Sequence, residues 1–274
     1  MKQKNNTATP SQQTENGKTV YGLVGFPLGH SFSARYFAGK FATEGINAEY
    51  RNFEIPEIGM LPEIINNTPS LRGLNVTIPY KQQIIPLLDE LDDNARRIGA
   101  VNVVCVSQNA EGIPHLTGRN ADVIGFTDSL RPLLRPAHKK ALVLGTGGAS
   151  RAVIHGLKML GISPLPVSRT PSEGVITYKD ITPDVMNEYK LLVNTTPLGM
   201  FPKTDRCPDI PYQQLTPEHL LYDLVYNPEE TLFLQRGRGY GAAVKNGLEM
   251  LHLQAEASWR FWNEESIDAF NNLF

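Results

Sequence analysis

Two side chains about forty residues apart could together move a proton. Lys81 ends the run Asn-Val-Thr-Ile-Pro-Tyr-Lys at 75–81, in which a predicted strand is followed at once by a proline-containing turn that presents the amine. Asp122 follows Asn120 and is expected at the start of a helix. An ammonium beside a ketone stabilises the charge that hydride addition leaves on oxygen and can deliver the proton, while a carboxylate holds the amine in place. The other interpretation of Lys81 is a surface lysine after a turn.

A glycine-rich turn supplies a candidate phosphate cradle. Gly145-Thr146-Gly147-Gly148-Ala149-Ser150 follows a short apolar segment, and a helix is expected from Ala149. Gly145 would allow a tight turn, Gly147 would let the backbone approach a pyrophosphate, and the helix would direct N–H groups at the anion. Ser150 stands in place of a third glycine. Such glycines can also serve only close helix packing, but the strand before them favours a dinucleotide site.

The residues after the next strand indicate which dinucleotide is bound. An NAD-binding chain usually carries Asp or Glu there to accept hydrogen bonds from the ribose hydroxyls, whereas this chain reads Ser168-Arg169-Thr170. The guanidinium of Arg169 can hold a 2′-phosphate through paired hydrogen bonds and stack on adenine. We therefore expect NADP rather than NAD. The alternative is that Arg169 is a solvent-exposed loop residue.

A loop after the first predicted strand could bind a polar substrate. It reads Gly-Phe-Pro-Leu-Gly-His-Ser-Phe-Ser at 25–33, at the end of the strand where ligands bind in open α/β sheets. Ser31 and Ser33 could orient a carboxylate or a polyol. Ser33 taken alone is also a good helix cap. His30 is expected to be structural, because Lys81 already accounts for proton transfer.

The elements that must position these residues alternate along the chain, which favours a mostly parallel sheet covered by helices. A helix at 122–134 separates two such units and marks the domain boundary. The prolines at 164 and 166 predict that one strand of the second unit is short or distorted. Strands are predicted at 19–26, 49–55, 74–77, 101–107, 140–144 and 163–167 and near Leu191 and Leu221, and the other helices at 33–45, 61–67, 89–98, 149–160 and 247–263.

Composition narrows the class of protein. The 274 residues carry 26 basic and 28 acidic side chains without a basic run, which argues against nucleic acid or an anionic membrane as a partner and favours a small molecule. Cys105 and Cys207 lie too far apart in sequence to predict a disulfide framework or a metal site, so a reducing, cytoplasmic location is expected. Residues 1–18 predict a disordered polar tail without a secretory signal, and no transmembrane segment is predicted.

Taken together, these motifs resemble the shikimate dehydrogenases, the NADP-dependent enzymes of aromatic amino-acid biosynthesis. The resemblance runs from about residue 20 to residue 262. It rests on the motifs already described and on four further runs: Gly-Ala-Val-Asn at 99–102, Asn-Thr-Thr-Pro-Leu-Gly-Met at 194–200, Asp-Leu-Val-Tyr-Asn-Pro at 223–228, and Asn-Gly-Leu-Glu-Met-Leu at 246–251 followed by Gln254-Ala255.

The resemblance implies an α/β fold of two domains and a role for each matching residue. The implied organisation is a substrate domain at 19–121, a Rossmann-like NADP domain with its linking helix at 122–245, and C-terminal helices at 246–274 that return to the first domain. Lys81 and Asp122 are implied as the catalytic pair. Substrate contacts are implied for Ser31, Ser33, Thr77, Asn102, Asp122, Tyr226 and Gln254, and cofactor contacts for Gly145, Thr146, Gly147, Gly148, Ala149, Ser168, Arg169, Thr170, Thr195, Leu224, Gly247 and Met250, with no metal.

Some positions depart from the family pattern, and other functions stay open. None of the changes removes a proposed catalytic group, but Ser168 in place of asparagine and the absence of a second basic residue in 171–178 make the cofactor preference less secure than the reaction. The rivals are a quinate or quinate/shikimate dehydrogenase, a methylene-tetrahydrofolate dehydrogenase, and a non-catalytic NADP-binding regulatory module. A monomer and a homodimer are equally compatible with the sequence. The remaining departures are Ala34, Ala121, Val123 and Asn246.

Overall fold

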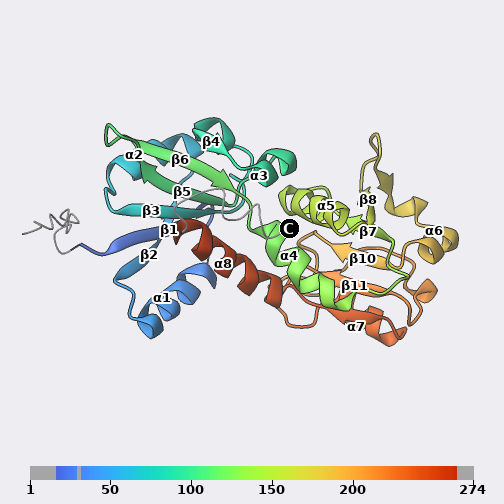
Figure 1. Ribbon diagram of the computed structural model, residues 1–274. Helices are drawn as coiled ribbons and strands as arrows, with labels where there is room; N and C mark the ends of the chain where they lie inside the picture. Colours follow the sequence, from blue (N-terminus) through green and yellow to red (C-terminus); the bar gives the residue numbers. More distant parts are fainter. Residues whose placement is uncertain (1–16, 30–31, 264–274) are drawn as a thin grey trace, which may run out of the picture.

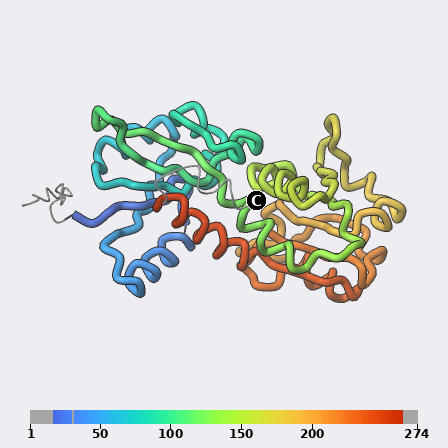
Figure 2. The backbone as a smooth tube through the Cα atoms, in the orientation of Figure 1, coloured from blue at the N-terminus to red at the C-terminus, as the bar shows by residue number. Residues whose placement is uncertain are grey.

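Two sheets lie side by side in the computed structural model, with helices α4 and α8 between them (Figure 1). The structure describes residues 17–29 and 32–263. The expected tail at 1–18 therefore lies almost wholly outside the described residues, as do His30, Ser31 and the last part of the C-terminal segment. The backbone trace shows the chain completing the first sheet before it enters the second (Figure 2). The predicted α/β class is confirmed.

The first sheet has the strand order β2-β1-β3-β5-β6-β4. The pairs β1–β2, β1–β3 and β4–β6 are parallel, whereas β5 pairs antiparallel with both β3 and β6. Helices α1 (Phe32–Glu44), α2 (Leu61–Asn66) and α3 (Asp93–Ile98) accompany it. The strands are β1 (Thr19–Gly25), β2 (Ala48–Glu54), β3 (Leu71–Val76), β4 (Glu90–Leu91), β5 (Val103–Gln108) and β6 (Pro114–Arg119).

The second sheet is parallel throughout, in the order β12-β11-β10-β7-β8-β9. Helices α4 (Asp122–Leu130), α5 (Gly148–Met159), α6 (Pro183–Glu188) and α7 (Leu232–Gly239) belong to this half of the chain. The central strands β7 and β10 are buried along their hydrophobic residues, as expected for a sheet covered on both faces. The strands are β7 (Lys140–Leu144), β8 (Ser163–Ser168), β9 (Ile176–Thr177), β10 (Leu191–Asn194), β11 (Leu220–Asp223) and β12 (Ala243–Lys245).

Strand β8 tolerates its two prolines because of the direction in which they face. Ser163 donates its N–H to Lys139, and Val167 accepts from Gly145, so the odd-numbered residues bond toward β7. Pro164 and Pro166 are even-numbered, so their backbone nitrogens face away from β7, toward the side where β9 lies. Strand β9 pairs only with the last two residues of β8. Their missing N–H groups therefore fall where β8 has no paired neighbour. The strand is six residues long rather than short.

Helix α8 (Leu248–Asn263) carries the chain back to the first sheet, in agreement with the expected return. It packs against α4 near its beginning and against β3 and β5 near its end. Trp262 donates its indole N–H to the carbonyl of Val104 at 3.1 Å, and its ring covers Gly73, where no Cβ would fit. A polar residue near the middle of α8 can therefore face the first sheet although it follows the second in sequence.

Three sequence expectations are corrected. The segment 89–98 is not one helix, because the Asp92 carboxylate accepts the N–H of Ala95 and caps a helix that begins at Asp93. The helix expected at 122–134 ends as an α-helix at Leu130, and the next turn, which contains Pro132, is a 3-10 helix. Ser33 is not the cap of α1, because the helix already includes Phe32.

Candidate active site

The predicted catalytic and substrate residues lie around one cavity of about 290 Å³. Residues from both halves of the chain contribute to it, since Tyr226 follows β11 and Gln254 lies on α8. Ser31 lies outside the described residues. Every other predicted substrate residue lines this cavity together with Lys81, namely Ser33, Thr77, Asn102, Asp122, Tyr226 and Gln254.

Lys81 and Asp122 form an ion pair in this cavity. The Lys81 ammonium donates to Oδ2 of Asp122 at 2.6 Å, and the side chains are 17% and 11% exposed. The other carboxylate oxygen accepts from the Asn102 amide at 2.7 Å, and the Asn102 amide oxygen accepts the backbone N–H of Ala121, also at 2.7 Å. Asn102 therefore fixes both the carboxylate and the start of α4. The amine is held in one place and remains accessible to a small molecule.

A second polar network supports the floor of the cavity. The buried side chain of Asn75 accepts from the Tyr50 hydroxyl at 2.9 Å and donates to the Ser258 hydroxyl at 2.9 Å. Desolvation raises the pKa of Tyr50, and a hydrogen bond with Ser33 opposes this shift, so the phenol is neutral and can donate. The network joins β2, β3 and α8 with Ser33. It supports the part of the cavity that Ser33 and Asn75 line.

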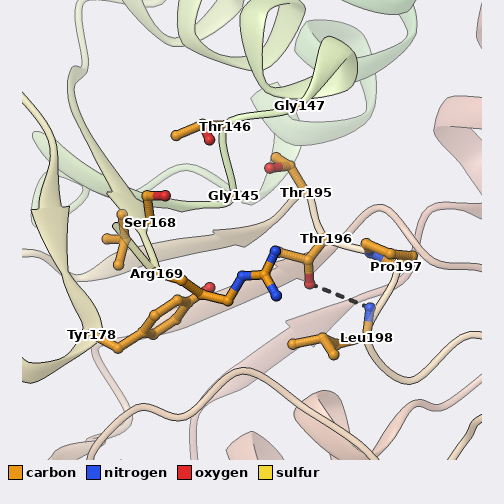
Figure 3. A pocket seen from close by; sticks show the side chains of 11 residues that line it. Gly145, Thr146, Gly147, Ser168, Arg169, Tyr178, Thr195, Thr196, Pro197 and Leu198 are labelled. Carbon is orange, nitrogen blue, oxygen red and sulfur yellow. Dashed lines mark hydrogen bonds between the residues drawn. The ribbon is translucent and has the colours of Figure 1, made fainter. Parts of the chain in front are cut away.

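The glycine-rich turn lines a separate cavity of about 350 Å³ (Figure 3). Gly145 has φ +111°, and a Cβ there would lie 2.8 Å from the Thr195 hydroxyl, so only glycine fits the turn. At Gly147 and Gly148 a Cβ would meet no atom within 4 Å, which leaves the start of α5 open to a ligand. An open turn, a helix N-terminus and a cavity suit the pyrophosphate of a dinucleotide. These residues fit NADP as cofactor.

Arg169 lines this cavity with an extended side chain. Its exposed side chain runs from the ring of Tyr178 toward Thr196 and Leu198 (Figure 3). Burial raises the pKa of Tyr178, and the positive charge of Arg169 opposes that shift. Tyr178 therefore presents a neutral ring. A planar guanidinium in a cavity that an aromatic ring also lines is suited to stack on adenine and to reach a phosphate on its ribose.

The other predicted cofactor residues line neither of the two cavities. Thr170 follows Arg169, and Gly148 and Ala149 begin α5. Leu224 and Gly247 touch, because a Cβ on Gly247 would lie 2.1 Å from the Leu224 carbonyl oxygen. Met250 is buried in the core beside Phe126. The predicted residues that do line the dinucleotide cavity are Gly145, Thr146, Gly147, Ser168, Arg169 and Thr195.

A buried carboxylate anchors the loop that carries Tyr226. Asp223 accepts from the Asn194 amide at 2.9 Å, from the Val225 N–H at 3.0 Å and from the Thr231 hydroxyl at 2.5 Å. Burial raises the pKa of Asp223 to about 6, although these three hydrogen bonds act in the opposite direction. The carboxylate ties the ends of β10 and β11 to the start of α7. It thereby holds in place the loop whose Tyr226 lines the substrate cavity.

The raised pKa of Asp223 predicts a specific pH dependence of stability. Between about pH 4 and pH 6 the folded state binds more protons at this site than the unfolded state, so this contribution to the free energy of unfolding grows as the pH falls through that range. Asp223→Asn should remove it, since an amide can still accept from Val225 and donate to Thr231. Urea unfolding of both proteins should give a wild-type minus variant difference that rises by up to about 3 kcal/mol from pH 7 to pH 4. A difference independent of pH would contradict this.

Residues 17–29 and 32–263 include no helix that could span a membrane. In the same ranges no three His, Cys, Asp or Glu side chains are grouped in a way that could hold a metal ion. The described residues provide two candidate sites so far, one cavity lined by an amine–carboxylate pair and one lined by a phosphate-binding turn.

Comparison with known proteins decides the family. Residues 23–104 match the family described as the shikimate dehydrogenase substrate binding domain. The shikimate dehydrogenase (NADP(+)) of Desulforamulus reducens is 37% identical over 94% of this chain and 95% of its own length. The chain belongs to the shikimate dehydrogenase family. The matched segment contains Lys81, and the longer alignment covers both cavities.

Solved structures agree with this assignment. A shikimate 5-dehydrogenase from Thermus thermophilus, solved with NADP(H) and shikimate, has a TM-score of 0.76 and 32% identity, and the match covers 89% of this chain and 93% of that one. A quinate dehydrogenase from Corynebacterium glutamicum, solved with NAD, has a TM-score of 0.78 and 27% identity, covering 90% and 94%. The predicted two-domain, Rossmann-like fold of the shikimate dehydrogenases is confirmed.

Sequence reasoning missed several residues around the two cavities of this shikimate dehydrogenase family member. Asn75 opens the same run that supplied Thr77 and Lys81, so a polar side chain within a buried strand was a usable signal. Leu251 lies one turn before Gln254 on α8. No comparable signal marks Leu23, Phe32 or Tyr178. The missed lining residues are Leu23, Phe32, Asn75, Val76 and Leu251 in one cavity and Val167, Tyr178, Thr196, Pro197 and Leu198 in the other.

Proposed function

We propose that this protein is a shikimate dehydrogenase that reversibly reduces 3-dehydroshikimate to shikimate with NADPH. The observation that carries the proposal is the 2.6 Å ion pair between Lys81 and Asp122 in a polar cavity, within a chain of this family. The cavity of about 290 Å³ suits a small, highly hydroxylated acid. The reaction belongs to the biosynthesis of aromatic amino acids.

Lys81 is proposed as the group that transfers the proton. Its ammonium would donate to the ketone oxygen as negative charge develops there, and it would take the proton back in the oxidation direction. Asp122 keeps the ammonium in position, and Asn102 keeps the carboxylate in position. Bound NADPH supplies the hydride. The ammonium serves both as the proton donor and as the charge that stabilises the alkoxide.

The remaining polar residues of the cavity are proposed to orient the substrate. Ser33 and Tyr226 would bind one end of the molecule together with Ser31. Thr77, Asn102 and Gln254 would bind ring hydroxyls, since their side chains line the same cavity near the ion pair. Because the carboxylate and each hydroxyl are bound by separate residues, a substrate with the wrong arrangement of oxygens would leave buried polar groups unpaired.

The proposed NADP preference rests on Arg169 and can be tested there. We expect Arg169→Ala to raise KM for NADP⁺ about tenfold or more, because the variant loses charge-assisted hydrogen bonds to the 2′-phosphate. The KM for NAD⁺ should change less than about threefold. Arg131→Ala, at an exposed arginine that lines neither cavity, serves as the control. Equal losses for both nucleotides in Arg169→Ala would place the 2′-phosphate elsewhere.

The domain boundaries and the cellular setting belong to the same proposal. We assign 19–121 to a substrate domain, 122–245 to an NADP domain with its linking helix, and 246–274 to a segment that returns to the substrate domain. The two sheets and the path of α8 support this division. The protein is proposed to act in the cytoplasm on a small molecule, without a metal. Both a monomer and a homodimer are compatible with it.

Quinate is the second candidate substrate. The structural likeness to the quinate dehydrogenase from Corynebacterium glutamicum favours it, and Arg169 counts against an NAD-dependent enzyme of that kind. A regulatory module that binds NADP without turnover would conflict with the intact Lys81–Asp122 pair. Shikimate with NADP remains the proposed combination.

Isotope transfer tests the proposed reaction. Purified protein is incubated with 3-dehydroshikimate and NADPH deuterated at the transferable position, and the product is analysed by mass spectrometry and by chromatography against shikimate. The proposal predicts shikimate carrying one deuterium. Unchanged 3-dehydroshikimate under conditions where NADPH binding is measured calorimetrically would overturn it and favour the regulatory module.

A further inference from the structure

A second opening adjoins the dinucleotide cavity at Arg169. It measures about 530 Å³, and Arg169, Tyr178 and Leu198 line both it and the dinucleotide cavity. The two are therefore contiguous around the side chain that is proposed to hold the 2′-phosphate. The other residues that line the second cavity are Pro171, Thr177, Lys179, Cys207 and Asp209.

The segment after β8 brings Lys179 to this cavity. In place of a helix, the chain makes a short turn, with a bridge between Ser172 and Val175, and then returns as β9. Strand β9 pairs parallel with β8, so that Thr177 lies opposite Ser168. This return places Lys179, eleven residues after Ser168, beside the same opening as Arg169.

The position of Lys179 is fixed by a local cap. Thr177 donates both its N–H and its hydroxyl to the Asp180 carboxylate at 2.7 Å, which closes a 3-10 helix over Tyr178–Asp180. Those two hydrogen bonds hold the pKa of Asp180 below its usual value. The ionised carboxylate of Asp180 therefore accepts both hydrogen bonds of the cap. The cap thus holds Tyr178 and Lys179 in a regular turn, from which Tyr178 lines both cavities and Lys179 lines the second one.

The charges around this opening suit an anion. Arg169 and Lys179 both line it, and neither forms an ion pair with a described residue. Asp209 is the acidic side chain that also lines the opening. A phosphate monoester carries between one and two negative charges at pH 7 and offers three acceptor oxygens. A single guanidinium would neutralise only part of the charge of such a phosphate and would not bond all three of its oxygens.

We propose that Lys179 is a specificity-determining residue that supplies the second cation for the adenosine 2′-phosphate of NADP. Between Ser168 and Thr177 Arg169 is the only basic residue, and Glu173 is acidic, so the sequence next to Arg169 provides no such partner. Lys179, in the 3-10 helix that follows β9, provides the second cation instead. The inference rests on the proposed preference for NADP.

Calorimetric titration with two adenosine nucleotides tests this role without turnover. Adenosine 2′,5′-bisphosphate and 5′-AMP differ by the 2′-phosphate alone, and each is titrated into wild type, Lys179→Ala and Lys158→Ala. Lys158 is an exposed lysine near the end of α5 opposite to the glycine-rich turn, so its variant controls for the loss of a surface charge in the same half of the chain. Thermal unfolding of each variant checks that the fold is retained.

The expected result is selective for the bisphosphate. Lys179→Ala should weaken its binding about fivefold, the upper end for an exposed charge pair, and should leave 5′-AMP unchanged. Lys158→Ala should match wild type with both nucleotides. If wild type prefers the bisphosphate and Lys179→Ala keeps that preference in full, the role of Lys179 is overturned while NADP specificity stands. If wild type binds the two nucleotides equally well, both the NADP preference and the role of Lys179 are overturned. An equal loss for both nucleotides would also overturn the role.

Discussion

Replacing Lys81 with alanine is expected to lower kcat by roughly a thousandfold or more, because the variant loses both the proton donor and the positive charge beside the developing alkoxide. The dissociation constants for shikimate and NADP⁺ should stay within about threefold of wild type, since the other lining residues are unchanged. Steady-state rates give the first quantity, and calorimetric titration gives the second.

The control for this variant is the neighbouring exposed residue. Gln82 follows Lys81 on the same turn and does not line the cavity, so Gln82→Ala should keep wild-type rates. A Lys81→Ala variant with wild-type kcat would remove the lysine from the mechanism. A large loss of substrate affinity with little change in kcat would instead assign Lys81 to binding.

Replacing Asp122 with asparagine should lower kcat by roughly a hundredfold, because the ammonium loses the charge that positions it. An asparagine can still accept from Asn102 through its oxygen, but its amide N–H₂ would then face the Lys81 ammonium, and two donors cannot bond. Steady-state kinetics in both directions measure the effect. Asp128→Asn, on the same helix but outside the cavity, should match wild type.

The double variant shows whether the two residues act as one unit. If Asp122 acts through Lys81, adding Asp122→Asn to Lys81→Ala should cost little beyond the loss in Lys81→Ala alone. Losses that multiply would mean that Asp122 contributes independently, for example by binding a substrate hydroxyl. Wild-type turnover in Asp122→Asn would remove the carboxylate from the proposed pair.

The catalytic residues could be predicted from the sequence because each is tied to a local motif at the end of a strand. Lys81 follows β3 through a proline-containing turn, and Asp122 begins the helix after β6. Strand β5 lies between β3 and β6 and pairs antiparallel with both, so β3 and β6 run in the same direction and end at the same edge of the sheet, where the two residues come together. Gln254 could not be placed in this way. Its position depends on the return of α8 to the first sheet, which was inferred from the family resemblance.

Strand β6 shows where local reasoning failed. Residues 114–119 begin with Pro114 and contain Gly118, two residue types that are unfavourable in strands, so no strand was predicted there. The tertiary structure overrides this weak preference. Strand β5 pairs antiparallel with β6, and a Cβ on Gly118 would lie 2.6 Å from Leu88, so the glycine is required for packing. The direction in which the chain reaches Asp122 follows from that pairing.

The cofactor side was predicted less completely, because its outer end is built by contacts between distant segments. The glycine-rich turn and Arg169 carry local signals, whereas Tyr178 and Leu198 reach the cavity through the β8–β9 pairing and the loop after β10. Nothing in residues 171–179 indicated that the chain would return beside Arg169. The sequence therefore pointed to the pyrophosphate turn and to one phosphate ligand, but not to the full adenosine pocket.

Nicotinamide absorbance in a four-way comparison tests the central claim most directly. Purified protein is incubated with shikimate or quinate, each with NADP⁺ or NAD⁺, and the appearance of reduced nicotinamide is followed. We expect rapid turnover with shikimate and NADP⁺ and much slower turnover with the other three pairs. Preferential turnover of quinate with NAD⁺, or no turnover with any pair despite measurable binding, would contradict the assignment.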